Sequence, residues 1–141
     1  MSEPFDAAVS IAGTLSGVLN AQINKRDMDV GVVLYEVTPN GELFHLTYFL
    51  GRASYARDMT TRHLLTPGTL ASIPFNRTRL VSRKLQAGSR LLVVVDVNKN
   101  RFSQVNYGTG KDVSDESIAD AGVPLRVQWQ NDSYVQIPIM K

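Results

Sequence analysis

Apolar side chains along this chain recur at every second position far more often than at helical spacing, which predicts strands over most of its length. The longest alternation covers residues 9–23, where the odd positions are apolar or glycine. This run exceeds an ordinary strand, and its glycines predict a bend where one strand passes between two sheets. Residues 30–37 are apolar on both alternations, which is typical of a central strand.

Turn-forming residues separate the predicted strands. Thr38-Pro39-Asn40-Gly41 should join the central strand to a return strand over residues 43–50, because Asn-Gly tolerates positive φ. Residues 51–68 lose the alternation and predict a long ordered loop, a kind of segment that is often functional in small domains. Further strands are expected over residues 69–75, 77–85 and 91–97.

The last third of the chain predicts one helical turn and one hairpin. Ser114 is the expected cap of the turn, since acidic residues follow it directly. Within residues 125–139, apolar residues occupy every second position on both sides of Asn131-Asp132, which predicts a hairpin that turns at these two residues. Trp129 alternates with apolar neighbours and is therefore expected in the core.

About eight or nine strands with almost no helix and no internal repeat predict an all-β fold. We expect residues 1–141 to form a single domain, a jelly-roll β-sandwich of two antiparallel sheets. A chain of 141 residues with 43% hydrophobic residues can bury a sufficient core without disulfides or a structural metal.

The composition excludes several classes of protein. There is no cysteine, which removes thiolate catalysis, disulfide frameworks and zinc sites of the cysteine type. No apolar run is long enough to cross a membrane, so no membrane partner is expected. The lack of a signal peptide in this chain, together with the lack of cysteine, favours a cytoplasmic location.

Charge is distributed unevenly although the net charge is only +2. Ten basic and two acidic residues lie between Arg52 and Arg101, whereas the remainder of the chain holds five basic and eleven acidic residues. The asymmetry indicates an anionic partner or an acidic neighbouring surface, or it is neutralised when the basic middle packs beside the acidic ends.

The chain lacks the patterns of a catalytic or metal centre. It has no Gly-x-Ser-x-Gly, and His45 and His63 have no serine placed beside them by a motif, so no catalytic residue is predicted. The two histidines lack zinc-ligand spacing, and no cofactor is expected. One acidic cluster lacks the order of a calcium loop and is expected to cap a helical turn; it comprises Asp112, Asp115, Glu116 and Asp120.

A basic stripe is present after the fourth predicted strand, but it does not indicate nucleic-acid binding. Aromatic residues are scattered rather than interleaved with it, and such charges commonly protect strand edges from aggregation. The stripe consists of Arg77, Arg79, Arg83 and Lys84.

Six short motifs in order resemble the C-terminal non-catalytic domain of X-Pro dipeptidyl-peptidases and cocaine-esterase (CocE/NonD) hydrolases. The resemblance covers about residues 5–139. The motifs are VVLYEVTPNG (32–41), GRASYAR (51–57), LTPG (65–68), GSRL (88–91), NRF with NYGTG (100–110) and YVQIPI (134–139).

The resemblance implies a sandwich similar to galactose-binding modules, appended to an α/β-hydrolase domain that this chain does not contain. In such serine hydrolases the sandwich packs on the catalytic domain, helps to shape the mouth of the active site and influences substrate choice or oligomerisation. The parent reaction would be hydrolysis of an X-Pro peptide or of an acyl ester. This chain alone would not be an enzyme, and a homo-oligomer is one possible assembly.

The Arg-rich loop is the candidate contact with that catalytic domain, since its side chains suit carboxylates across an interface. The candidate residues are Arg52, Arg57, Asp58, Arg62 and His63. The alternative is that Arg52 and Arg57 brace their own loop by bonding within it. An alternative function is a carbohydrate-binding module, because the same sandwich serves that role and Trp129 and the tyrosines could stack on sugars.

Overall fold

The computed structural model describes residues 1–76, 78–98, 100 and 102–140, and it is built almost entirely of strands. The strands are β1 Val9–Gly13, β2 Ser16–Ile23, β3 Asp29–Val37, β4 Leu43–Arg52, β5 Leu70–Phe75, β6 Val81–Leu85, β7 Arg90–Val97, β8 Val127–Trp129, β9 Tyr134–Gln136 and β10 Ile139–Met140. Three short 3-10 turns complete it: η1 Ala53–Tyr55, η2 Val113–Asp115 and η3 Ile118–Asp120. In the described part of the chain, no helix has the length and apolar character needed to span a membrane.

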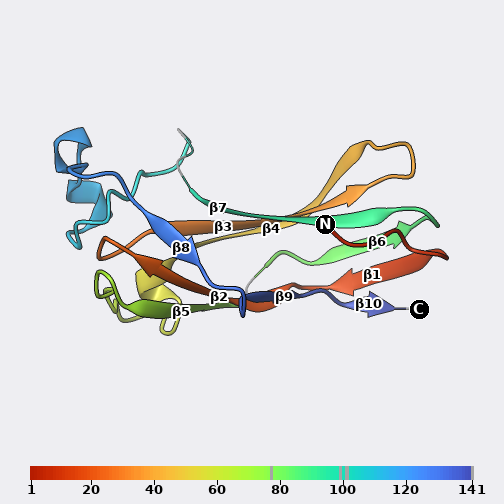
Figure 1. The fold of residues 1–141 in the computed structure, drawn as a ribbon, viewed down its shortest axis with the longest axis horizontal. Coiled ribbons are helices and arrows are strands. Elements are labelled where there is room, and N and C mark those ends of the chain that lie inside the picture. Colours follow the sequence, from red (N-terminus) through yellow and green to blue (C-terminus); the bar gives the residue numbers. More distant parts are fainter. Residues whose placement is uncertain (77, 99, 101, 141) are drawn as a thin grey trace.

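The strands form two layers (Figure 1). One layer is a sheet with the order β4-β3-β7. The other contains two sheets placed end to end, one with the order β10-β1-β6 and one in which β2 pairs with β5, β8 and β9. All pairings between these strands are antiparallel. The predicted all-β sandwich of antiparallel sheets is confirmed.

The bend expected within residues 9–23 lies between β1 and β2. Thr78 Oγ1 accepts a hydrogen bond from Leu15 N (2.6 Å) at this point, and Leu15 is fully buried. Gly13 has a φ of +140°, where a Cβ would lie 2.9 Å from the ring of Pro138. The chain therefore leaves one sheet at β1 and enters the next at β2, as predicted.

The hairpin predicted at the end of the chain is wrong. β8 and β9 both pair with β2 in the same direction, and β10 continues beside β1. Ser133 Oγ accepts from Asn20 N (2.9 Å), so Asn131-Asp132 loops out of a strand that goes on instead of turning back. The expectation that Trp129 is in the core is also wrong, because β8 is an edge strand and Trp129 remains 39% exposed.

Two smaller expectations also need correction. The strand predicted over residues 77–85 begins at Val81, and Arg77 lies outside the described residues, as does Arg101 of the fifth motif. The predicted helical turn is η2, but its cap is Asp112, whose carboxylate accepts from Ser114 N (2.9 Å). A second turn, η3, follows directly.

The core lies between the two layers and fixes the ends of β3. Its fully buried members include Ile11, Leu15, Val30, Val32, Leu34 and Ile73. Each buried side chain of this size contributes about 1.5–3 kcal/mol relative to an exposed one. Three buried acidic residues lie along this strand: Asp27 just before β3, Asp29 at its first position and Glu36 near its last.

Candidate functional site

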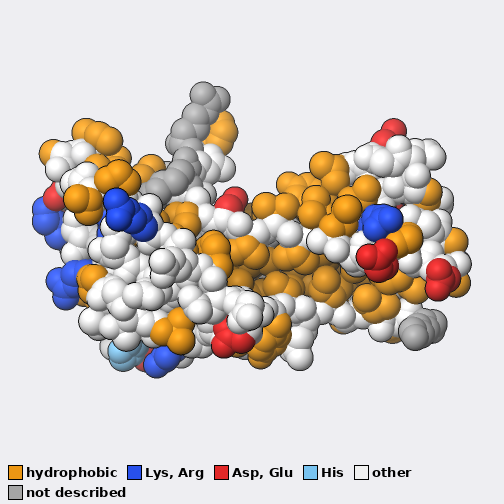
Figure 2. Space-filling view, viewed as in Figure 1, with side chains coloured by type: hydrophobic (Ala, Val, Ile, Leu, Met, Phe, Trp, Pro, Cys, Tyr) orange, Lys and Arg blue, Asp and Glu red, His pale blue; other side chains and the backbone are white. Residues whose placement is uncertain are grey.

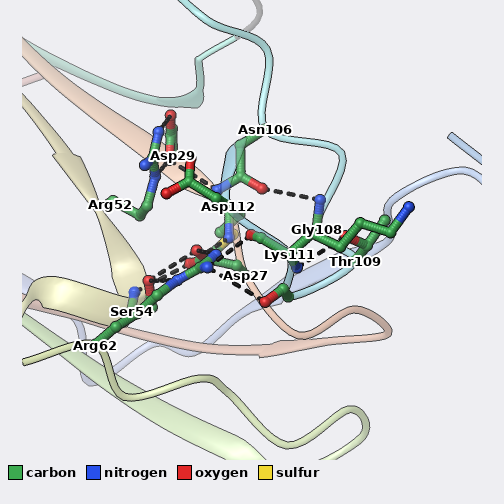
Figure 3. Close-up of polar contacts among 12 residues, drawn as sticks. Asp27, Asp29, Arg52, Ser54, Arg62, Asn106, Gly108, Thr109, Lys111 and Asp112 are labelled. Atoms are coloured by element: carbon green, nitrogen blue, oxygen red, sulfur yellow. Dashed lines mark hydrogen bonds and ion pairs between the residues drawn. The ribbon is translucent and has the colours of Figure 1, made fainter. Parts of the chain in front are cut away.

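A buried carboxylate organises the loop that the sequence singled out (Figure 3). Asp27, just before β3, is 1% exposed and accepts from Ser54 Oγ (2.7 Å) and Ser54 N (3.0 Å) of η1. Arg62 Nη2 lies 3.0 Å from Oδ2 of Asp27, the same carboxylate oxygen that accepts from Ser54 Oγ. Because a buried charge is costly unless it is paired and hydrogen-bonded, these contacts fix residues 53–62 against the start of β3.

A second pair lies beside the first. Arg52, at the end of β4, donates from Nε (2.8 Å) and Nη2 (3.1 Å) to the two carboxylate oxygens of Asp29. Asn106 Nδ2 donates to the same carboxylate at 2.9 Å. The hydrogen bond to Asp29 raises the pKa of the Arg52 guanidinium, with burial opposing the change. This forked geometry makes the pair specific for arginine.

The same contacts join the Arg-rich loop to the loop after β7. Arg62 Nη1 donates to the carbonyl oxygens of Gly110 (3.2 Å) and Lys111 (2.6 Å). Gly108, with a φ of +77°, accepts from Arg26 N (3.0 Å) through its carbonyl. The two loops therefore form one braced unit at this end of the sandwich.

The candidate contact residues fall into two groups. Arg52 and Arg62 make the internal pairs just described, and their side chains are 26% and 20% exposed. Arg57 and His63 are exposed and line a cleft of about 170 Å³ with residues 64–66 and 69–72. The Asp58 carboxylate accepts hydrogen bonds from Thr60 Oγ1 and Thr60 N, and these bonds lower the pKa of the Asp58 carboxyl to about 2.

A wider groove of about 690 Å³ also borders η1. Arg52 and Arg57 line it together with apolar side chains from β4, η1 and β5. The apolar residues include Phe49, Leu50, Tyr55, Met59 and Phe75. Arg57 therefore borders both hollows and presents a charge between two partly apolar surfaces.

Ser54 is not placed to act as a nucleophile. The Ser54 hydroxyl donates to Asp27 and is 1% exposed, so it cannot reach a substrate. His63 meets Ser54 only through its backbone N–H. His45 lies elsewhere, on the exposed face of β4 between the rings of Tyr35 and Tyr48. Among the described residues, no group of histidine and acidic side chains could hold a metal ion.

The predicted acidic cluster supports backbone turns. Asp112 caps η2, and Asp120 accepts from Ser117 N (2.9 Å) at the start of η3. Glu116 accepts from Thr109 Oγ1 and from the N–H groups of Thr109 and Tyr107. Burial opposes ionisation of Glu116, but these hydrogen bonds outweigh it and lower the pKa of the carboxyl.

A further buried ion pair connects the two layers near the other end of β3. Glu36 is 2% exposed, and its carboxylate accepts from Arg83 Nε (2.9 Å) of β6 and from Ser89 Oγ (2.8 Å). The Arg83 guanidinium also lies 4.0 Å from the ring centroid of Phe44. Arg83 therefore bridges the layers and does not simply protect a strand edge.

Folding neutralises part of the charge asymmetry. Four basic residues of the segment 52–101 each form an ion pair with one acidic residue outside that segment. The pairs are Arg52–Asp29, Arg62–Asp27, Arg83–Glu36 and Arg90–Glu3. The alternative in which the basic middle packs beside the acidic ends therefore accounts for these four charges.

The fold and the braced loops define a β-sandwich domain in which the Ser54 hydroxyl is buried. The family model of the X-Pro dipeptidyl-peptidase C-terminal non-catalytic domain matches residues 1–136. The chain belongs to this family, as its six motifs indicate. Among curated protein sequences, none matches it significantly.

Solved structures share the fold. An α-amino acid ester hydrolase superimposes with a TM-score of 0.88 at 20% identity over 98% of this chain and 24% of the other. An aminopeptidase from a marine sediment Thaumarchaeota archaeon superimposes with a TM-score of 0.89 at 18% identity, over 99% of this chain and 25% of the other. A CocE/NonD family hydrolase from Staphylococcus aureus superimposes with a TM-score of 0.68 at 16% identity, over 97% of this chain and 29% of the other. The chain thus spans about a quarter of the length of these relatives, and none of the comparisons supports a carbohydrate-binding module.

Sequence reasoning missed the acidic partners Asp27, Asp29 and Glu36. One signal was available, since Glu36 is a charged residue within an otherwise apolar run and such a residue needs a buried partner. Its partner Arg83 is far away in the sequence and could not be identified from spacing alone.

Proposed function

We propose that this domain is the accessory part of a serine hydrolase, packing on an α/β-hydrolase domain and helping to shape access to its active site. The family match supports the proposal, since the family is by its description non-catalytic and C-terminal. The relatives in which the fold recurs are described as hydrolases or as an aminopeptidase and are about four times longer than this chain. An X-Pro peptide or an acyl ester is the proposed substrate of the parent enzyme.

The observation that carries the docking part of the proposal is the position of Arg57 and His63. Both are exposed and line the cleft, and Arg57 also lines the larger, partly apolar groove, while the loop beneath them is held rigid by Asp27 and Asp29. A preorganised loop loses little conformational entropy on binding, which suits a stable interdomain contact. In this proposal Arg57, Asp58 and His63 contact the hydrolase domain directly, and Arg52 and Arg62 position them.

The test combines a chemical probe with an antibody against residues 1–141. Fluorophosphonates label the active-site serine of serine hydrolases, so the antibody should precipitate a labelled polypeptide from the native source. That polypeptide is either the same chain or a tightly bound partner. Precipitation without any labelled polypeptide would contradict the proposal.

The purified chain provides the complementary control. It should remain unlabelled and should not hydrolyse an X-Pro chromogenic substrate. Turnover that persists after His45→Ala and His63→Ala would contradict the prediction that this chain has no catalytic site. Self-association is a separate prediction, checked by sedimentation of the purified chain.

A further inference from the structure

β7 lies in one layer of the sandwich and β9 and β10 lie in the other (Figure 1), and side chains of all three strands line one groove. This groove of about 460 Å³ has Phe5, Val93, Val135 and Ile137 in its lining. Figure 2 shows hydrophobic side chains gathered there, over the half of the molecule that contains β1, β7 and β10. A contiguous apolar surface of this kind is typical of an interaction site.

The edge of β7 beside the groove also carries unpaired backbone groups. β7 pairs with β3 on its other side, and antiparallel pairing turns the N–H and C=O of alternate residues to the free edge. The contacts of Ser2 show that Leu91 is one of the residues facing this edge, because Ser2 N donates to Leu91 O (2.8 Å) and Ser2 Oγ accepts from Leu91 N (2.9 Å). Val93 and Val95 belong to the same set, and no partner for them on this edge exists among the described residues.

The N-terminal residues already begin a strand along this edge. Phe5 N donates to Ser89 O (2.9 Å), and Gly88 N donates to Phe5 O (2.7 Å). With Ser2 opposite Leu91, the segment runs antiparallel to β7, and its pairing ends before Val93. The position and direction of a further strand are therefore set by contacts already present.

We propose that an extended segment of the hydrolase polypeptide adds to β7 as an antiparallel strand opposite Val93 and Val95. Its alternate apolar side chains would fill the groove toward Val135 and Ile137. This inference rests on the proposed function, and the relatives, about four times longer than this chain, have additional polypeptide to supply such a strand. Main-chain hydrogen bonds would provide affinity, and the groove would select apolar side chains.

The experiment uses the purified chain and a synthetic peptide of alternating threonine and valine with a lysine at each end. Amide hydrogen exchange followed by NMR should be fast at Val93 and Val95 in the free protein. Saturating peptide should slow it by about tenfold or more, as strand pairing protects free edge amides. Methyl resonances of Val135 should shift at the same time.

Neighbouring residues of β7 provide a matched pair of variants. Val93→Lys places a charge in the groove and should weaken peptide binding about tenfold or more. Val94→Lys places the same charge on the outer face, where Val94 is 37% exposed, and should change binding less than about twofold. If Val93→Lys fails to fold, Val135→Lys introduces the charge from the opposite wall and should have the same effect.

Three results would overturn the inference. The peptide does not bind, it protects the free edge of β4 instead of β7, or Val93 and Val95 are already protected in a dimer of this chain. None of these results affects the fluorophosphonate experiment, so failure of this inference is distinguishable from failure of the proposed function.

Discussion

Arg62 Nη2 lies 3.0 Å from a carboxylate oxygen of Asp27, whose side chain has no exposure to solvent. The two residues come from the Arg-rich loop and from the start of β3, and Arg62 continues to the carbonyls of Gly110 and Lys111. One guanidinium therefore holds three segments together. This contact explains how a loop with little regular structure keeps Arg57 and His63 in place.

Removing the Arg62 guanidinium should destabilise the domain strongly. Arg62→Met leaves the Asp27 carboxylate buried without its cation, and breaking a buried ion pair in this way typically costs about 3–5 kcal/mol. Urea unfolding followed by tryptophan fluorescence measures the loss. Arg57→Met is the matched control, since Arg57 is exposed, and should change the free energy of unfolding by less than about 0.5 kcal/mol. Equal effects of the two substitutions would contradict the internal role of Arg62.

The pair between Glu36 and Arg83 should show coupling in a double-mutant cycle. Arg83→Met alone leaves Glu36 buried with only Ser89 as a side-chain partner and should cost about 3 kcal/mol. Adding Glu36→Gln removes the unpaired charge and should recover part of that loss. Additive effects of the two substitutions on the free energy of unfolding would show that the pair does not bridge the layers.

Gly108 should be far less tolerant of alanine than Gly41, although both have positive φ. A Cβ at Gly108 would lie 2.7 Å from Asp27 O, whereas the space around Gly41 is open. Gly41→Ala should cost only the conformational penalty of about 1–2 kcal/mol, and Gly108→Ala should cost more because backbone must move. Thermal unfolding of both variants checks this order, and a reversed order would contradict the close packing of the two loops.

Glu116 should contribute to stability in a pH-dependent way. Its pKa in the folded protein lies below the ordinary value of 4.5, so the folded state binds fewer protons than the unfolded state as the pH falls. The contribution is fully present above that ordinary value and is lost as the pH drops through the folded pKa. Unfolding of wild type and Glu116→Gln should therefore differ most near neutral pH and converge in acid. A constant difference across the acid range would contradict the hydrogen bonds assigned to this carboxylate.

The period-two pattern predicted the sandwich well because alternation follows directly from one buried face. It failed at residues 125–139, where Asn131-Asp132 has the composition of a hairpin turn. Whether such a turn reverses the chain depends on Asn20, which holds Ser133 beside β2. The candidate loop was identified by its composition, but the division between bracing arginines and exposed residues depends on Asp27 and Asp29, which only the folded chain brings near.

The contact of Arg57 and His63 with a hydrolase domain can be probed by substitution in the native protein. Arg57→Glu reverses the charge between the two hollows and should weaken the assembly most at low salt, where the new repulsion is least screened, without altering unfolding of the isolated domain. Lys84→Glu, a reversal at an exposed position of β6, is the control and should leave the assembly unchanged. Equal effects of both reversals would indicate a general charge effect and not a contact at the loop.

Hydrogen exchange compared between the isolated chain and the fluorophosphonate-labelled hydrolase tests the central claim most directly. The amides of Ser54 and His63 should be protected in both forms, because they donate to Asp27 and to Ser54 O within the domain. The amides of residues 57–59 should gain protection only in the hydrolase, because the proposed interdomain contact covers them there. Identical exchange of residues 57–59 in the two forms would contradict the proposed contact.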